Sequence, residues 1–260
     1  MTTVITHSNL LTGRSLLALR RQPVFLAITL VQPVIWLLLF GELFRSVVQI
    51  PGFGSGGETY LEFLTPGVVM MTALFSSGWA GTTYIEDIDR GVMDRLLSSP
   101  VRRGALMSGP LVYQALTTLL QTLIILGIAV LAGARFTGGL AGVGITLLAA
   151  ALLAVVFAAV SNAVALLVRQ QEALIGVSQF LTLPLQFLSA AFMDLSLAPA
   201  WLQAVARYNP VNWAVLASRD ALGPATDWTM VWGRMGALAV AAVALAWVAT
   251  RAFRRYQASA

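Results

Sequence analysis

The sequence predicts an all-α polytopic membrane protein with six transmembrane helices, and three observations point to this fold class. Hydrophobic residues make up 58% of the 260 residues and charged residues only 10%, whereas soluble domains carry about 25% charged residues. The mean hydropathy is +0.82. Six runs with almost no charge are each long enough to cross about 30 Å of hydrocarbon. Most of the protein surface therefore has to face lipid.

The six spans form one transmembrane domain over residues 1–260. We place them at about 23–41, 63–85, 106–132, 138–168, 173–193 and 230–250. The charge-free runs that contain the third and fourth spans are long enough for their ends to project into the interfaces or for the helices to tilt. The first apolar run is longer than the core of a signal peptide and no small-residue cleavage site follows it, so we expect it to remain as an anchor.

Two segments outside the spans have predictable local structure. Residues 1–22 are basic and predict a cytoplasmic N-terminal helix that starts near Ser8, a suitable N-cap. Residues 41–62 form an outer loop with a Gly- and Pro-rich stretch, which is typical of a flexible link. In the fourth span, Gly138 and Gly142 form a small-xxx-small pair, which at a helix end is weak evidence for dimerisation.

The outer segment 194–229 is too polar to span and too apolar for a solvated loop. Pro199 is expected to open a helix that runs through Arg207, and Asn209–Pro210 to end it. A second short helix should follow near Val211–Leu222. We expect both helices to dip back into the membrane as a re-entrant segment, because irregular backbone at that depth is stable when protein covers it. Two interfacial helices that lie flat are the alternative.

The positions of the arginines predict the orientation. With both termini in the cytoplasm, eleven of the sixteen Arg residues fall on the inner segments and five on the outer ones. This distribution follows the positive-inside rule.

The same composition excludes several kinds of chemistry. Every basic residue other than His7 is Arg, and a phosphate loop of the Walker type needs a Lys. The chain has no Cys and one His, His7, so Cys/His metal clusters and Cys nucleophiles are excluded, and Ser–His catalysis would depend on a residue that precedes the first span. We therefore predict no catalytic residues, no metal site and no bound cofactor.

The spans contain almost no charge, which disfavours transport driven by a proton or sodium gradient but leaves a channel possible. Candidates for lining a passage for amphipathic molecules are Met71, Phe75 and Trp79 in the second span and Gln179 and Gln186 in the fifth. Ordinary helix packing and interhelical hydrogen bonds are the alternative for each of them.

The inner loop 86–103 holds four acidic residues and four Arg. Helical spacing over Val92–Leu97 predicts a short amphipathic helix, with Met93, Leu96 and Leu97 apolar beside Asp94 and Arg95, and Pro100 should stop it. Such a helix is suited to being gripped by a cytoplasmic partner. A solvated loop that only sets the topology is the alternative, but it leaves the four acidic residues without a role.

The inner loop, with its neighbouring motifs, resembles the type-2 ABC transporter permeases, and most closely the daunorubicin-resistance group of drug exporters. The motifs are Phe63-Leu-Thr-Pro66-Gly67, then Glu86, then Gly91-Val-Met93-Asp94-Arg95-Leu96-Leu97-Ser-Ser-Pro100-Val-Arg102. Arg21-Gln-Pro23 precedes the first span, and Leu197-Ala-Pro199-Ala-Trp201-Leu202, Asn209-Pro210 and Arg219 precede the last one. In this order the motifs cover nearly the whole chain.

The resemblance implies a complex of two six-span permease subunits, identical or related, with two separate ABC ATPase subunits that bind ATP and Mg. It implies that the stretch around Gly91–Pro100, flanked by Glu86 and Arg102, is the coupling helix, that the N-terminal helix cradles the ATPase, and that Pro199, Trp201, Asn209, Pro210 and Arg219 belong to the re-entrant segment. The expected activity is export of hydrophobic or amphipathic, drug- or lipid-like molecules from the cytoplasm across a prokaryotic plasma membrane, with lipid but no nucleic acid as a partner. A homo-oligomeric channel without an ATPase is the alternative. An intramembrane enzyme ranks last, because the spans lack paired acids, His and Cys.

Cysteines introduced into this cysteine-free chain test the predicted topology. Cysteines in place of Ser98 and Ser259 should react with an impermeant thiol reagent only from the cytoplasmic side, and one in place of Ser55 only from outside. Labelling of Ser55→Cys and Ser98→Cys from the same side would contradict the six-span topology.

Overall fold

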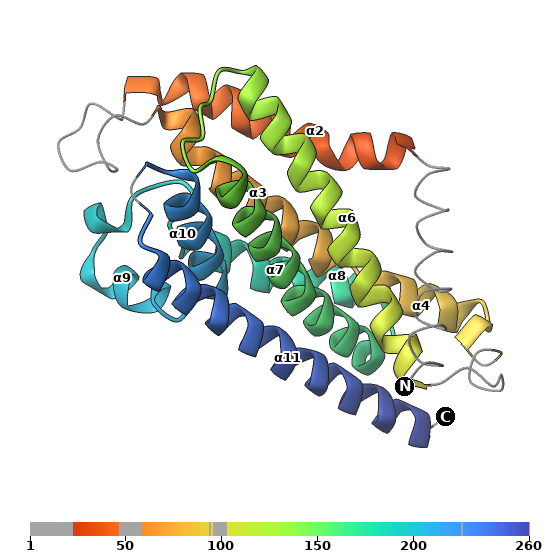
Figure 1. Ribbon diagram of the computed structural model, residues 1–260. Coiled ribbons are helices and arrows are strands. Elements are labelled where there is room, and N and C mark those ends of the chain that lie inside the picture. Colours follow the sequence, from red (N-terminus) through yellow and green to blue (C-terminus); the bar gives the residue numbers. More distant parts are fainter. Residues whose placement is uncertain (1–22, 47–58, 94, 96–102, 225, 260) are drawn as a thin grey trace.

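The computed structural model describes residues 23–46, 59–93, 95, 103–224 and 226–259, and these ranges contain helices and turns but no strand. The all-α prediction is therefore confirmed for this part of the chain. The elements are α2 (Pro23–Leu43), α3 (Tyr60–Gly78), α4 (Thr82–Asp89), α6 (Arg103–Leu131), α7 (Gly139–Val168), α8 (Gln171–Phe187), the short 3₁₀ helix η2 (Leu195–Leu197), α9 (Ala200–Ala206), α10 (Pro210–Leu222) and α11 (Trp228–Ser259) (Figure 1). The predicted N-terminal helix over residues 1–22 lies outside the described residues.

Four helical segments among the described residues are long and apolar enough to cross a membrane. They are Tyr60–Asp89, Ser108–Leu131, Gly139–Val168 and Trp228–Phe253. The apolar part of α2, Ala27–Leu43, and the 17-residue α8 are shorter. Crossing by α2 and α8, and with it the total of six spans, stays a prediction.

Helix α7 occupies the middle of the bundle and packs against α3, α6, α10 and α11. Helix α4 and the last turns of α11 lie at one end, and α9 and α10 at the other (Figure 1). Following the predicted orientation, we name these the inner and outer ends. The main apolar core runs through the middle and outer parts of the bundle, and a second cluster around Tyr84, Leu174 and Phe253 fills the inner end.

Two predicted spans differ from the observed helices. The second span is interrupted between α3 and α4 at residues 79–81. The fifth was expected to reach residue 193, but α8 ends at Phe187, and the carbonyl oxygens of Leu185 and Leu188 accept hydrogen bonds from Asn209 instead of continuing the helix.

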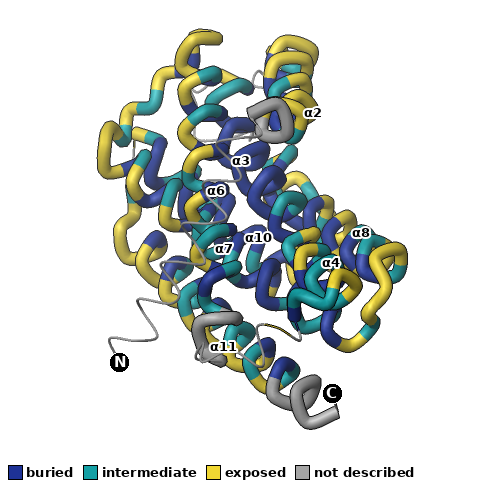
Figure 2. Tube along the Cα trace, turned by 90° about the vertical axis from the view of Figure 1, so that its right-hand side faces the viewer, coloured by how far each residue is buried: buried dark blue, intermediate teal, exposed yellow. Residues whose placement is uncertain are grey.

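Helix α10 lies inside the outer end of the bundle, between α3, α7 and α11, and most of it is buried (Figure 2). Its last turn lies directly on Gly138 and Gly142: a Cβ atom at either glycine would overlap the Ala221 carbonyl oxygen, and the Gly138 amide donates to the Leu222 carbonyl at 3.0 Å. The glycine pair therefore serves a close approach within the chain, which explains it without a dimer contact.

Two glycines of α7 provide a matched test of this contact. Gly142→Ala should lower the free energy of unfolding by about 1–3 kcal/mol, as overpacking does, because the backbone of α10 has to move. Gly144→Ala meets no atom within 4 Å and should be neutral or raise it by up to about 1 kcal/mol. Unfolding of the purified variants in detergent measures both, and equal effects would contradict the close approach.

Candidate functional site

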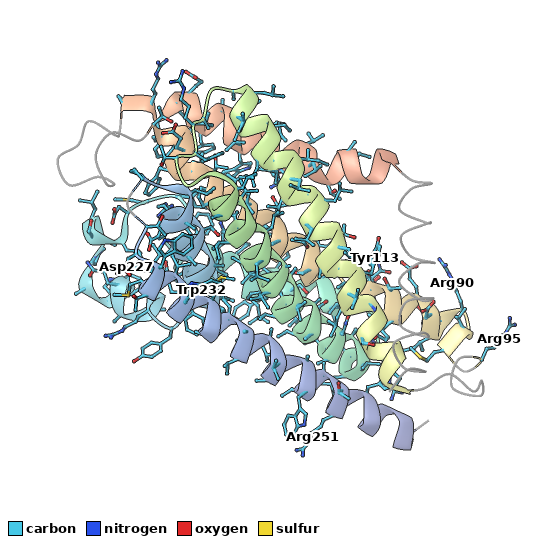
Figure 3. All side chains as sticks on the ribbon, viewed as in Figure 1. Arg90, Arg95, Tyr113, Asp227, Trp232 and Arg251 are labelled. Carbon is cyan, nitrogen blue, oxygen red and sulfur yellow. The ribbon has the colours of Figure 1, made fainter. Side chains whose placement is uncertain are left out.

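The predicted coupling loop begins at the inner end of the bundle. Arg90, Arg95 and Arg251 all lie at this end, and Asp227 lies at the opposite one (Figure 3). This end therefore carries three of the arginines on which the predicted orientation rests, beside the acidic residues of α4. The orientation itself stays a prediction.

The geometry of Gly91 determines how the chain leaves α4. The backbone at Gly91 has φ +64°, a left-handed conformation that favours glycine at a helix end. Its amide donates to the Ile88 carbonyl at 3.0 Å, and one turn of α4 is supported by the Glu86–Arg90 ion pair at 3.4 Å. Residues 92, 93 and 95 are again helical, so the described part of the loop has helical residues on both sides of this glycine.

The side chain of Met93 points to a different place from the one predicted. We expected it to enter a partner's cleft, but it is 2% exposed and packs within the inner apolar cluster of its own chain. Met93 therefore anchors the loop to the bundle, and Arg95 is exposed. The remaining predicted coupling residues, Asp94, Leu96, Leu97, Pro100 and Arg102, lie outside the described residues.

The interruption between α3 and α4 is held by serines from two other helices. Ser161 of α7 donates to the Gly78 carbonyl at 2.6 Å and accepts from the Gly81 amide at 3.0 Å. Ser178 of α8 donates to the same Gly78 carbonyl at 2.7 Å. A Cβ at Gly81 would lie 2.5 Å from the Ser161 carbonyl oxygen. The break that precedes the predicted coupling loop is thus a close contact of α3, α7 and α8.

At the outer end, the predicted helix starts are confirmed. Pro199 is the N-cap of α9, and Asn209 is the N-cap of α10 with Pro210 directly after it. Trp201 on α9 is 62% exposed. Helix α9 thus lies on the surface while α10 is inserted, and whether α10 lies at membrane depth stays a prediction.

Two asparagines join the start of α10 to the end of α8. Asn209 donates to the carbonyls of Leu185 and Leu188 at 2.7 and 2.9 Å. Asn212 accepts from the Ala190 amide at 3.0 Å and donates to the Ala206 carbonyl at 3.0 Å. These side chains satisfy backbone groups that the ends of α8 and α9 leave open.

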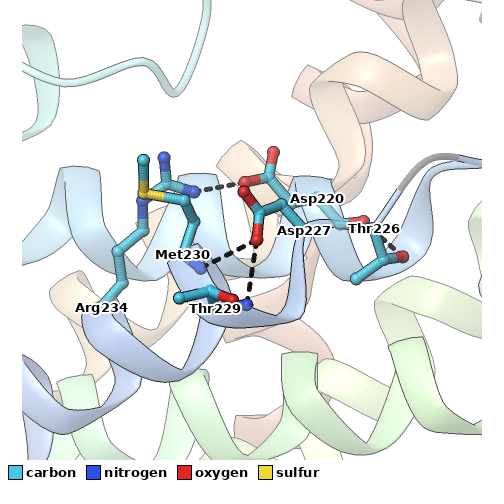
Figure 4. A network of polar contacts seen from close by, with 6 residues as sticks. All are labelled: Asp220, Thr226, Asp227, Thr229, Met230 and Arg234. Carbon is cyan, nitrogen blue, oxygen red and sulfur yellow. Dashed lines mark hydrogen bonds and ion pairs between the residues drawn. The ribbon is translucent and has the colours of Figure 1, made fainter.

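Arg219, near the other end of α10, also donates hydrogen bonds to backbone carbonyls outside its own helix. Its Nη2 atom donates to the carbonyls of Phe63 and Ala190, at 3.1 and 2.7 Å, and its guanidinium lies 3.6 Å from the centroid of the Phe63 ring. The next residue, Asp220, pairs with Arg234 of α11, and Asp227 caps the start of α11 through the amides of Thr229 and Met230 (Figure 4). Helix α10 is therefore fixed to α3, to the segment after α8 and to α11.

Four of the predicted passage residues lie on the adjacent helices α3 and α8, and Trp79 lies in the break after α3. The five side chains differ in burial. Met71 and Gln186 are 5% and 1% exposed, Phe75 and Gln179 are half-buried, and Trp79 is 47% exposed. Neither polar atom of the Gln186 amide has a hydrogen-bond partner among the described residues. Their role in a passage stays a prediction.

A buried polar face on α6 escaped sequence reasoning. Gln114, Thr118, Gln121 and Thr122 are each at most 6% exposed. The signal is present in the sequence as amide and hydroxyl residues at helical spacing, but none of them carries a charge. Among the described residues no group of three His, Cys, Asp or Glu side chains is placed to hold a metal ion.

An apolar helical bundle with four segments long enough to cross a membrane, and an outer end closed by a buried helix, defines a polytopic integral membrane protein. The chain belongs to the ABC-2 type transporter family, which matches residues 7–222.

Named relatives agree with this family. The chain is 31% identical over 218 residues to the daunorubicin resistance ABC transporter permease protein DrrB1 of Streptomyces coeruleorubidus, which covers 83% of this chain and 75% of the relative. It is 25% identical over 215 residues to the "Probable doxorubicin resistance ABC transporter permease protein DrrC" of Mycobacterium tuberculosis, with 83% and 76% covered. It is 28% identical over 207 residues to the "Putative transport permease ycf38" of Cyanophora paradoxa, with 79% of this chain and 70% of the relative covered.

Substitution of Arg219 tests whether the outer end depends on it. Arg219→Gln should lower the free energy of unfolding by about 2.5–4 kcal/mol, because it removes at least one charged hydrogen bond, worth roughly 1.5–3 kcal/mol, and the ring contact, worth about 1 kcal/mol. The free energy of unfolding of Arg219→Lys should lie between those of the parent and Arg219→Gln, because one ammonium group cannot reproduce the guanidinium fork. The exposed Arg207 supplies the control, Arg207→Gln, with an effect within about 0.5 kcal/mol. Unfolding in detergent measures all three, and equal losses for Arg219→Gln and Arg207→Gln would contradict the assignment.

Proposed function

We propose that the chain is the membrane-spanning permease subunit of an ABC exporter that moves hydrophobic or amphipathic, drug- or lipid-like molecules out of the cytoplasm. The energy comes from a separate ATPase, present in two copies, and a second, identical permease subunit completes the passage. The drug-resistance names of two relatives support the class of substrate.

The observation that carries this proposal is the construction of the inner end. The loop after α4 is held close to the bundle by Met93 and turned by Gly91, and α4 is joined to α3 through the serine-bonded break. A partner that pulls on the loop thereby acts on α3, α7 and α8 together. A loop that only sets topology needs none of these contacts.

In this mechanism the chain makes and breaks no covalent bond. ATP and Mg bind to the partner ATPase, which closes on ATP and moves the coupling helices. The two helical bundles then repack, and the passage changes from inward- to outward-facing. The complex resides in a prokaryotic plasma membrane with both termini of this chain in the cytoplasm, and α9 and α10 dip back from the outside.

Pull-down of the ATPase tests the docking. Leu96→Ala and Leu97→Ala each remove an apolar anchor and should weaken association by about 1–3 kcal/mol. Asp94→Ala removes a charge that we expect at the rim of the cleft, and it should cost about 0–1 kcal/mol. A titration of purified ATPase against each permease variant gives the three affinities.

Tyr208→Ala is the control, because Tyr208 is 78% exposed at the opposite end and should leave association unchanged. If both Leu variants bind and transport like the parent, the docking assignment is wrong. If the parent itself captures no ATPase, the exporter proposal fails and a channel without an ATPase replaces it.

A further inference from the structure

Helix α6 is amphipathic in the opposite sense to a helix of a soluble protein. Its apolar residues Val112, Leu116, Leu120 and Leu123 are 38–50% exposed. Its polar residues Gln114, Thr118, Gln121 and Thr122 face the interior and are at most 6% exposed. We call these four residues the α6 polar stripe. At about 1.5 Å per residue, the stripe extends roughly 12 Å along the helix.

The stripe lies where α6 meets α2 and α3. The Gln114 amide nitrogen donates to the Ser76 hydroxyl of α3 at 3.1 Å and to the Thr118 hydroxyl at 3.4 Å. The Gln121 amide nitrogen donates to the Thr29 hydroxyl of α2 at 3.4 Å. Three helices therefore contribute amide and hydroxyl groups to one buried polar locus.

One polar atom of this locus is left without a partner. The Gln121 side chain is 2% exposed, and its Oε1 atom makes no hydrogen bond with the described residues. Rotating the Gln121 amide by 180° exchanges Oε1 and Nε2, and Nε2 is then the atom without a partner. Buried polar groups are normally satisfied, so a stripe that served only to join helices would be expected to pair this amide.

Among the described residues, the polar groups that α2, α3 and α6 bring to the stripe are uncharged. The sequence has no Asp, Glu, Lys or Arg over residues 22–41, 63–85 and 104–134, which contain the facing parts of α2, α3 and α6. Burial of an ionised group without a partner is strongly unfavourable. A hydroxyl group of a ligand can donate to the unpaired Gln121 Oε1, whereas an ether or ester group can only accept and a charged group finds no counter-charge on these segments.

We propose that the α6 polar stripe binds the uncharged, hydrogen-bonding part of the transported amphiphile. The proposal rests on the exporter function above and narrows its substrate class to molecules that join an apolar body to neutral polar groups. It also places substrate recognition at the junction of α2, α3 and α6, whereas the passage residues predicted from the sequence lie around the contact of α3 and α8.

Photo-crosslinking to the purified full chain in lipid nanodiscs tests this, with three probes that share one diazirine-bearing acyl chain. The probes carry a neutral glucosyl head, a trimethylammonium head or a methyl ester. The parent should crosslink the glucosyl probe at the lowest half-saturating mole fraction. Gln121→Leu and Thr118→Val should each raise that fraction about 3- to 10-fold, as loss of one net hydrogen bond does.

Thr146→Val is the matched control. Thr146 is a fully buried threonine of α7 whose hydroxyl bonds to the Gly142 carbonyl in its own helix, so crosslinking should not change. If Gln121→Leu fails to assemble, Thr118→Val carries the test. A parent without preference for the glucosyl head, or stripe variants that lose stability but crosslink like the parent, would overturn the proposal. The assay contains no ATPase, so this result is independent of the pull-down that decides the exporter function.

Discussion

Within hydrocarbon, a peptide group that leaves the helical hydrogen-bond pattern has to find its partner inside the protein. Among the described residues, the helices of two predicted spans depart from this pattern, between α3 and α4 and after α8. In both places the open backbone groups are satisfied by side chains from other helices: Ser161 and Ser178 at the first, Asn209 and Arg219 at the second. A few uncharged polar side chains and one arginine thus determine the shape of both ends.

The sequence predicts those features of the fold that have local causes. Long apolar runs locate α6, α7 and α11, and Pro199 and Asn209–Pro210 locate α9 and α10 to within a residue or two. The two departures from helix escaped prediction because their causes are distant. The break at 79–81 contains no proline or charge, and its partner Ser161 lies 80 residues further along the chain.

For the candidate sites too, features with local causes could be predicted and features with distant causes could not. The charged inner loop could be read from composition, but helical spacing alone does not say whether an apolar face meets its own bundle or a partner, and Met93 meets its own bundle. Polar residues of α6 were missed because amides and hydroxyls carry no charge signal. Arg219 was predicted from a resemblance, while its two carbonyl partners depend on the three-dimensional arrangement.

The position of α6 in the chain bears on the order in which the protein is made. Synthesis proceeds from the N-terminus, so α2 and α3 already exist when α6 leaves the ribosome, and its amide-bearing face can be covered as soon as it enters the bilayer. The carbonyls at the end of α8 have to wait for their hydrogen-bond donors, because Asn209 and Arg219 are translated after them. A nascent chain that ends before α10 therefore holds a completed three-helix group but an outer end that is still open.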